Sequence, residues 1–218
     1  RLAQGELNQS DDLYELARSV AWIDLFDDKK TFAVHVSGDN AFFKNTQFAG
    51  LRVKDAVVDQ FRAKNGTRPN VDPQNPDVLI QIHLQKDQAA IYLDLAKDSL
   101  HKRGYRHANT FAPLKENLAA ALLIRAGWQA DAEAGGVLVD PMCGSGTFLI
   151  VAAWVSADIA PGINRGYYGC LGFSAHDPVA WKAIREEAEE RRHAGLNNAL
   201  PKIFGFDASE EALLAAQR

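Results

Sequence analysis

The chain of 218 residues contains only two cysteines, a single methionine and no adjacent pair of prolines. Cys143 and Cys170 are too few for a disulfide framework or a zinc site, so we expect a reducing, cytoplasmic setting and no bound metal. No apolar run approaches the roughly 20 residues that a bilayer span needs, and the first residues lack the basic-then-apolar pattern of a signal peptide. We therefore expect no membrane partner.

The sequence also lacks an excess of positive charge. It holds 24 Lys and Arg against 28 Asp and Glu, a formal net charge of -4. This balance excludes a general attraction to nucleic acid, so any contact with RNA requires a local basic patch. The first residue is not Met, and the chain stops inside a helical pattern, 209–218. These two observations predict that the chain is a piece of a longer protein.

The first half predicts a small α/β layer domain with helices on one face of a sheet. In chain order, the periodicity favours a helix from Asp11 through Val20, a strand at 31–37, a helix at 50–64, and two strands at 78–84 and 89–95 joined by a hairpin turn.

The second half predicts a different alternation of elements. These are a helix from Leu114 to Ala126, a buried strand from Val137 to Asp140, a helix at about 147–156, a loop-rich segment at 160–173, a helix from Asp177 to about Ala194, and a short strand at 203–207 before a last helix. We place the domain boundary at 106–110, which divides the chain into 1–107 and 108–218.

The run Asp140-Pro141-Met142-Cys143-Gly144-Ser145-Gly146-Thr147 joins the expected strand to the next helix. Its two glycines let the backbone turn sharply and approach a ligand, because no Cβ intervenes. The helix start presents unpaired N–H groups and the positive end of the helix dipole. Leu149 replaces the third glycine of the dinucleotide pattern, which favours a smaller ligand with a carboxylate, such as the methionine part of S-adenosylmethionine. The alternative is a glycine-rich turn without a ligand.

Asp207 stands at the end of the second short strand. An acid at this place can accept hydrogen bonds from both ribose hydroxyls of an adenosyl group. Its interval from the glycine loop is about three times the usual one, which indicates that an insertion occupies 160–199. The alternative is that Asp207 caps the last helix.

A basic run extends from Lys97 to His107, with four Lys or Arg and two His in eleven residues. Lysine and arginine neutralise phosphates, and a tyrosine ring can stack on an unpaired base. The candidates for RNA binding are Lys97, His101, Lys102, Arg103, Tyr105 and Arg106. The alternative is a solvated linker between domains.

The glycine loop at 140–147, together with the run Ala-Pro-Leu-Lys-Glu-Asn-Leu-Ala-Ala-Ala at 112–121, resembles the bacterial 23S rRNA guanine-N2 methyltransferases of the K/L type. The segments 54–59, 94–95 and 100–106 are similar to that family's THUMP domain, an RNA-binding module. The resemblance implies an α/β fold in which a THUMP domain precedes the first part of a Rossmann-like methyltransferase domain.

The resemblance also implies site residues and partners. S-adenosylmethionine would be bound by Asp140, Pro141, Cys143, Gly144, Ser145, Gly146, Thr147 and Asp207, with Pro113 and Leu114 beside its pocket. The partner would be large-subunit ribosomal RNA, and the basic run would lie near the RNA path.

The chain departs from the family in the motif that would bind the acceptor base. Related amino-group methyltransferases carry an Asn/Asp-Pro-Pro-Tyr/Phe motif, and this chain has no Pro-Pro. We therefore assign no catalytic residue and expect the chain alone to be inactive. The alternatives are a tRNA guanine or DNA adenine methyltransferase, and a non-catalytic RNA-binding module whose second half is scaffold.

Overall fold

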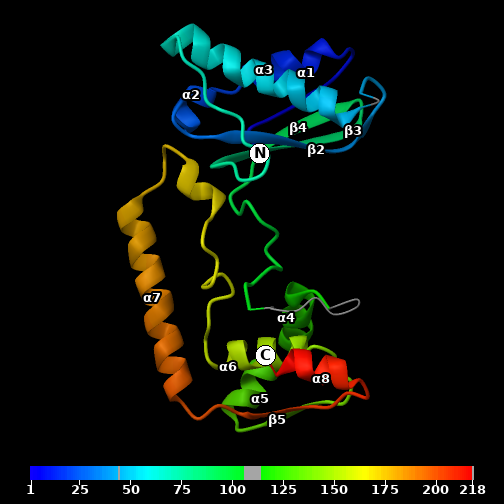
Figure 1. Cartoon of the computed structure of the whole chain (residues 1–218), viewed down its shortest axis with the longest axis vertical. Helices are drawn as coiled ribbons and strands as arrows, with labels where there is room; N and C mark the ends of the chain where they lie inside the picture. Colours follow the sequence, from blue (N-terminus) through cyan, green and yellow to red (C-terminus); the bar gives the residue numbers. More distant parts are fainter. Residues whose placement is uncertain (44, 106–113, 218) are drawn as a thin grey trace. The chain divides into compact units, whose positions relative to one another are not determined.

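The computed structural model describes residues 1–43, 45–105 and 114–217 (Figure 1). They form two compact units. The first unit comprises Arg1–Lys97 and Tyr167–His176, and the second comprises Asp98–Gly166 and Asp177–Arg218. The boundary expected at 106–110 lies outside the described residues.

A four-stranded sheet forms one layer of the first unit, in the order β1-β4-β3-β2. The strands are β1 (Ala3–Glu6), β2 (Phe32–Asn40), β3 (Val78–Lys86) and β4 (Gln88–Leu93). β4 runs antiparallel to both of its neighbours, and β2 runs parallel to β3. Helices α1 (Asp11–Arg18) and α3 (Thr46–Asn65) lie over the same face of the sheet (Figure 1). This arrangement confirms the predicted α/β layers.

The core of this unit lies between the sheet and its helices. Trp22, Phe26, Phe32 and Phe61 are fully buried there together with alternate residues of β3. Helix α3 starts earlier than the periodicity predicted, because the Asn45 side chain accepts a hydrogen bond from Gln47 N–H at 2.8 Å. Its end is as predicted, with Gly66 in the left-handed conformation.

The strand β1 and the short helix α2 (Trp22–Leu25) were not predicted. The sequence of β1, Ala-Gln-Gly-Glu, has no apolar alternation, so its strand conformation depends on pairing with β4. A four-residue helix is too short to show a helical period.

The segment Tyr167–His176 belongs to the first unit although it follows the glycine loop in sequence. It contains a 3-10 turn, η1 (Gly169–Gly172), and Phe173 packs against the first core. Cys170 N–H donates to Leu95 C=O at 3.1 Å, and Ser174 N–H donates to Leu25 C=O at 2.8 Å. A Cβ on Gly169 would lie 2.1 Å from Asp94 C=O, so the close approach requires glycine.

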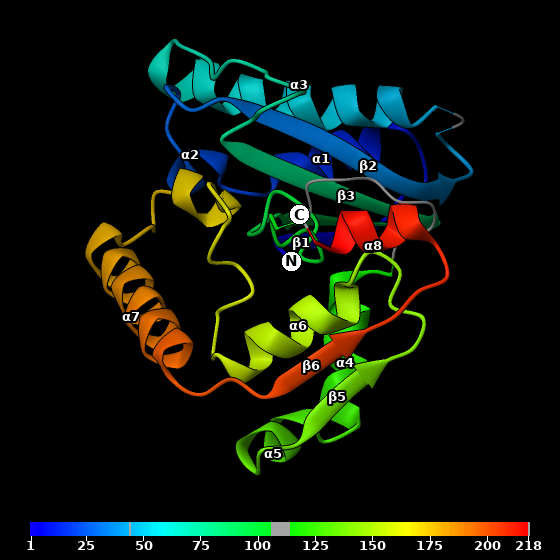
Figure 2. The ribbon, with the colours of Figure 1, turned by 60° about the horizontal axis from the view of Figure 1, so that its bottom comes forward.

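The second unit contains the parallel pair β5 (Val137–Asp140) and β6 (Lys202–Gly205). Its helices are α4 (Glu116–Arg125), α5 (Trp128–Glu133), α6 (Thr147–Ser156), α7 (Pro178–Asn197) and α8 (Glu210–Ala216). Figure 2 shows β5 and β6 side by side. The second core joins Ala119, Leu123, Trp128 and Val151, with Leu138 and Ile203 packed against it.

The prediction that β5 is buried is wrong for one of its faces. Val137 is 55% exposed and Val139 57%, and the neighbouring Phe204 and Phe206 are also exposed. Side chains alternate between the two faces of a strand. In the described residues, helices cover the face that holds Leu138 and Ile203, so the other face stays open.

Helix α7 confirms the prediction of a strongly charged outer face. Gly195 is its one fully buried residue, and ion pairs such as Arg191 with Asp158, at 2.8 Å, lie on its surface. The predicted cap is also present, since the Asp177 side chain accepts hydrogen bonds from the N–H groups of Val179 and Ala180.

Candidate cofactor-binding site

The glycine loop connects the end of β5 to the start of α6. Gly144 and Gly146 have φ of 55° and 77°, a left-handed conformation in which side chains are strained. Gly146 is also the N-cap of α6. A Cβ there would lie 3.1 Å from the Cβ of Ala216, so Gly146 meets both a conformational and a spatial limit.

Hydrogen bonds hold the loop against the end of β6. Phe206 N–H donates to Asp140 C=O at 2.8 Å, and Cys143 N–H donates to Phe206 C=O at 2.9 Å. Gly146 N–H then closes a turn on Cys143 C=O at 2.9 Å. The pairing of β5 with β6 therefore continues past both strands and fixes the path of the loop.

Asp207 adds a side-chain link to the same loop. One of its carboxylate oxygens accepts from Ser209 N–H at 2.9 Å, and the other accepts from Gly144 N–H at 2.8 Å. These hydrogen bonds, that from Ser209 first, lower the pKa of the Asp207 carboxyl below its usual 3.8. Asp207 is thus an ionised acceptor at neutral pH, directly beside the loop.

Ser209, rather than Asp207, is the N-cap of α8. Its hydroxyl accepts a hydrogen bond from Ala212 N–H at 3.2 Å, the usual geometry for a serine cap. The alternative interpretation of Asp207 as a helix cap is therefore wrong, and its carboxylate faces the loop instead.

Cys143 lies inside the loop and is buried. Burial, and then the negative charges of Asp140 and Asp207, raise the pKa of its thiol above the usual 9.0. The thiol therefore stays protonated at neutral pH and is a poor nucleophile.

The other predicted cofactor residues lie on or near this loop. Thr147 is the buried first residue of α6, Ser145 is half-buried, and Pro141 is exposed. Leu114 packs against the same core as α6. Pro113 lies outside the described residues. The structure thus gathers the residues at 140–147 with Asp207, while their binding of a cofactor stays a prediction.

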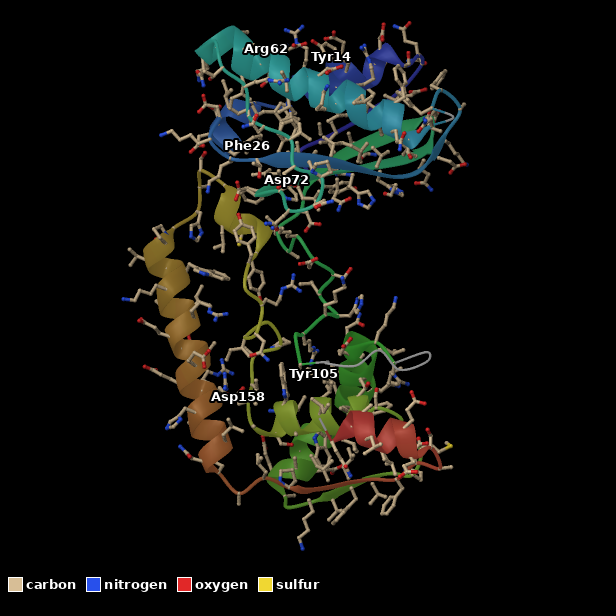
Figure 3. The ribbon with its side chains drawn as sticks, in the orientation of Figure 1. Tyr14, Phe26, Arg62, Asp72, Tyr105 and Asp158 are labelled. Carbon is tan, nitrogen blue, oxygen red and sulfur yellow. The ribbon has the colours of Figure 1, made fainter. Side chains whose placement is uncertain are left out.

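The predicted RNA-binding residues that the structure describes differ in their exposure and contacts. Lys97, in the first unit, donates to Asn75 at 2.7 Å and lies 4.4 Å from the ring centre of Tyr167. Arg103 is buried, with 9% of its surface exposed. Tyr105 (labelled in Figure 3) is partly buried against the second core and packs edge-on against Trp154, with ring centres 5.3 Å apart.

The remaining members of the basic run are more open. Lys102 is exposed and His101 is half-buried, while Arg106 lies outside the described residues. The RNA-binding role of these residues stays a prediction.

Arg165 is a residue that the sequence pattern did not reveal. Its guanidinium donates to the backbone C=O of Asp98 at 2.9 Å, of Ser99 at 3.1 Å and of Lys102 at 3.3 Å. It therefore fixes the backbone of the basic run from a position more than sixty residues away in sequence. A lone arginine in a glycine-rich loop carries no local signal of such a role.

In residues 1–43, 45–105 and 114–217, no group of three or more His, Cys, Asp or Glu is arranged to hold a metal ion. None of the helices described is both long enough and apolar enough to cross a membrane.

A strand, a glycine loop and a helix, with an acid at the end of the adjacent parallel strand, are the arrangement typical of Rossmann-like nucleotide-binding folds. Residues 103–218 match the family model described as RMKL-like, methyltransferase domain, and residues 8–94 match that of the THUMP domain. The first match covers more than half of the chain, which therefore belongs to the RMKL-like methyltransferase family.

Curated relatives are similar along almost the whole chain. The chain is 45% identical over 216 residues to the ribosomal RNA large subunit methyltransferase K/L of Syntrophotalea carbinolica, and 46% identical over 217 residues to that of Cellvibrio japonicus. Each alignment covers 99% of this chain but only 30% and 29% of the relatives. The chain thus spans less than a third of their length.

Solved structures agree with the fold. A crystal structure of a putative methyltransferase complexed with SAH is 30% identical, with a TM-score of 0.83 over 99% of this chain and 55% of its own. A predicted N6-adenine-specific DNA methylase from Listeria monocytogenes is 27% identical, with a TM-score of 0.80 and the same coverage of both chains.

Proposed function

We propose that this chain supplies the RNA-binding and cofactor-binding parts of an S-adenosylmethionine-dependent enzyme that methylates the N2 amino group of a guanine in large-subunit rRNA in the cytoplasm. The observation that carries the proposal is the identity of 45–46% along 99% of the chain to K/L methyltransferases, through both the THUMP half and the glycine loop.

The residues of the loop fit this cofactor. S-adenosylmethionine supplies a methyl group bound to a positively charged sulfur. The N–H groups at the start of α6 suit the carboxylate of its methionine part, because they lie at the positive end of a ten-residue helix. Asp207 accepts one bond per oxygen from the backbone, which leaves lone pairs for ribose hydroxyls. The glycines keep the space before the helix free of side chains.

The acceptor side of the reaction needs further groups. The lone pair of an exocyclic guanine amine is delocalised into the ring, so the amine is a poor nucleophile. Hydrogen-bond acceptors and a stacking ring must align it with the methyl group, and positioning supplies most of the acceleration. Because the chain has no Asn/Asp-Pro-Pro-Tyr/Phe motif, we propose that it binds cofactor and RNA but does not transfer the methyl group alone.

Cofactor binding is tested on the 218-residue chain by calorimetry with S-adenosylhomocysteine. We expect saturable binding that weakens at least tenfold, about 1.4 kcal/mol, in Asp207→Ala and is unchanged in Glu190→Ala on the exposed face of α7. Near-ultraviolet circular dichroism of both variants verifies folding. No binding by a folded chain would favour the alternative that the second half is only scaffold.

Substrate choice is tested with a chimera. The chain replaces the aligned 217 residues of the Cellvibrio japonicus enzyme, which keeps its remaining parts. We expect the chimera to methylate a 23S rRNA transcript at a guanine N2, identified by mass spectrometry of nucleosides, and the 218-residue chain to transfer nothing.

A second candidate function is methylation of adenine in DNA. It is favoured by the likeness to the Listeria monocytogenes protein, which is described as a predicted N6-adenine-specific DNA methylase. Transfer by the chimera to DNA or tRNA in preference to 23S rRNA would contradict the proposed substrate while leaving the cofactor assignment intact.

A further inference from the structure

A groove of about 570 Å³ lies in the first unit between the free edge of β2 and one side of α3. It is lined by Val34, His35 and Val36 of β2 and by Val71 and Pro73. The wall from α3 is formed by Thr46, Gln47, Gly50, Leu51 and Lys54. None of these residues belongs to the cofactor loop or to the basic run.

The edge of β2 carries hydrogen-bonding groups that point into this groove. Val78 N–H donates to Thr31 C=O, so the odd-numbered residues of β2 face β3 and the even-numbered ones face away from it. Throughout residues 1–43, 45–105 and 114–217, nothing bonds to the outward N–H and C=O groups of Val34 and Val36. Both residues are only half-buried.

The chain itself begins a fifth strand on this edge and then leaves it. Phe32 N–H donates to Asn70 C=O, and Asp72 N–H donates to Phe32 C=O, both at 3.0 Å, so Val71 forms a parallel bridge with Phe32. Pro73, which has no N–H, follows directly (Asp72 is labelled in Figure 3). The groove continues this edge of the sheet beyond Val71, along Val34 and Val36.

The walls of the groove suit the side chains of an added strand. Leu51 and Val71 are 51% and 46% exposed, which offers apolar contact on both sides. Gly50 leaves the α3 wall without a side chain at this point, where an added Cβ would be in ordinary contact with Val36 Cγ2 at 3.5 Å and near Val34 C=O at 3.9 Å. An extended peptide in this groove would place alternate side chains on the same side, so that they contact the same wall.

The charges of the groove favour an acidic segment. Among the described residues that line the groove, Lys54 is the one lysine or arginine, and its ion pair with the adjacent, partly exposed Asp55 contributes little. The carboxylate of Asp72 is close in sequence to the lining residues Val71 and Pro73 but does not line the groove; one of its oxygens accepts from the N–H groups of Gln74 and Asn75. A single lysine is too little to hold a run of RNA phosphates, but it suits one carboxylate.

We propose that this groove binds an extended segment of a partner protein as a fifth strand of the sheet, with apolar side chains at alternate positions and an Asp or Glu opposite Lys54. Backbone hydrogen bonds to Val34 and Val36 supply affinity, and Leu51, Val71 and Lys54 supply selectivity. The proposal does not depend on the methyltransferase function.

The test uses random nine-residue peptides displayed on phage, selected against the 218-residue chain and counter-selected against Gly50→Leu, whose side chain fills the groove. We expect enriched peptides that alternate apolar residues and contain an acid. A synthetic copy should slow hydrogen exchange of the Val34 and Val36 amides, measured by NMR. Its affinity should fall at least tenfold in Lys54→Glu and stay unchanged in Lys64→Glu, an exposed position of the same helix outside the groove.

Three results would overturn the proposal. They are the absence of any enriched peptide, binding that Lys54→Glu leaves intact, and a single-stranded RNA oligonucleotide that perturbs the Val34 and Val36 amides where the peptide does not. Lys54→Glu is a surface change, so it keeps the test decisive if Gly50→Leu does not fold.

Discussion

Asp207 connects the end of β6 to the glycine loop, because its two carboxylate oxygens accept from different backbone N–H groups. The sequence places an acid after a short strand, and this was enough to predict its location. That Ser209 takes over the helix cap depends on which side chain reaches Ala212 N–H, and both acids and serines favour that position. Only the folded geometry separates the two roles.

The lowered pKa of Asp207 predicts how its contribution depends on pH. A carboxyl with a folded-state pKa below its unfolded value stabilises the fold fully above the unfolded value, near 3.8, and loses this stabilisation as pH falls through the lowered pKa. We therefore expect Asp207→Asn to lower the melting temperature by a constant amount between pH 6 and 8, and by progressively less below pH 4.

The control for this measurement is Glu190→Gln, whose melting curve should follow that of the parent at every pH. A difference between Asp207→Asn and the parent that grows in acid would show that the link to Gly144 is not made by the ionised carboxylate.

Among the elements, the strand–loop–helix unit was the easiest to predict. A short apolar run before two glycines and a longer apolar run after them define β5 and α6, and the structure has both at the expected residues. The exposure of Val137 and Val139 could not be predicted, because an apolar run does not reveal which faces have a partner. β1 was missed since its strand conformation comes from pairing with β4.

The start of α6 offers a test of the glycine loop. We expect Gly146→Ala to destabilise the second unit by about 1–3 kcal/mol, because alanine must adopt a left-handed conformation and its Cβ would meet Ala216 at 3.1 Å. Urea unfolding monitored by tryptophan fluorescence measures the loss. Gly166→Ala is the matched control, since nothing lies within 4 Å of an added Cβ there, and its stability should differ by less than about 0.5 kcal/mol. Equal stabilities for the two variants would contradict the importance of the turn.

For the whole molecule, the chain passes between the two units after Lys97, after Gly166 and after His176. The sequence predicted a loop-rich insertion in this region but not its attachment to the first unit. Glycines and scattered aromatics carry no periodic signal, and the contact of Phe173 with the first core joins residues far apart in sequence.

We expect Phe173→Ala to destabilise the first unit by about 1–3 kcal/mol, less than for a fully buried phenylalanine because Phe173 is only partly buried. Hydrogen exchange read by mass spectrometry should show faster exchange in α2 and β3 and no change in α6. Ser174→Ala is the control, because it leaves the backbone N–H that donates to Leu25 in place. Faster exchange in α6 alone would contradict the assignment of this segment to the first unit.

The return of Tyr167–His176 to the first unit has a consequence for biosynthesis. A ribosome adds residues in order, and a domain contiguous in sequence can complete its folding while the next is still being made. Here the amino-terminal sheet and helices emerge early, yet Phe173 and the glycines that fit against Asp77 and Asp94 arrive only after the glycine loop has been translated. Completion of the first unit is thereby delayed until β5 and α6 of the second unit have been synthesised.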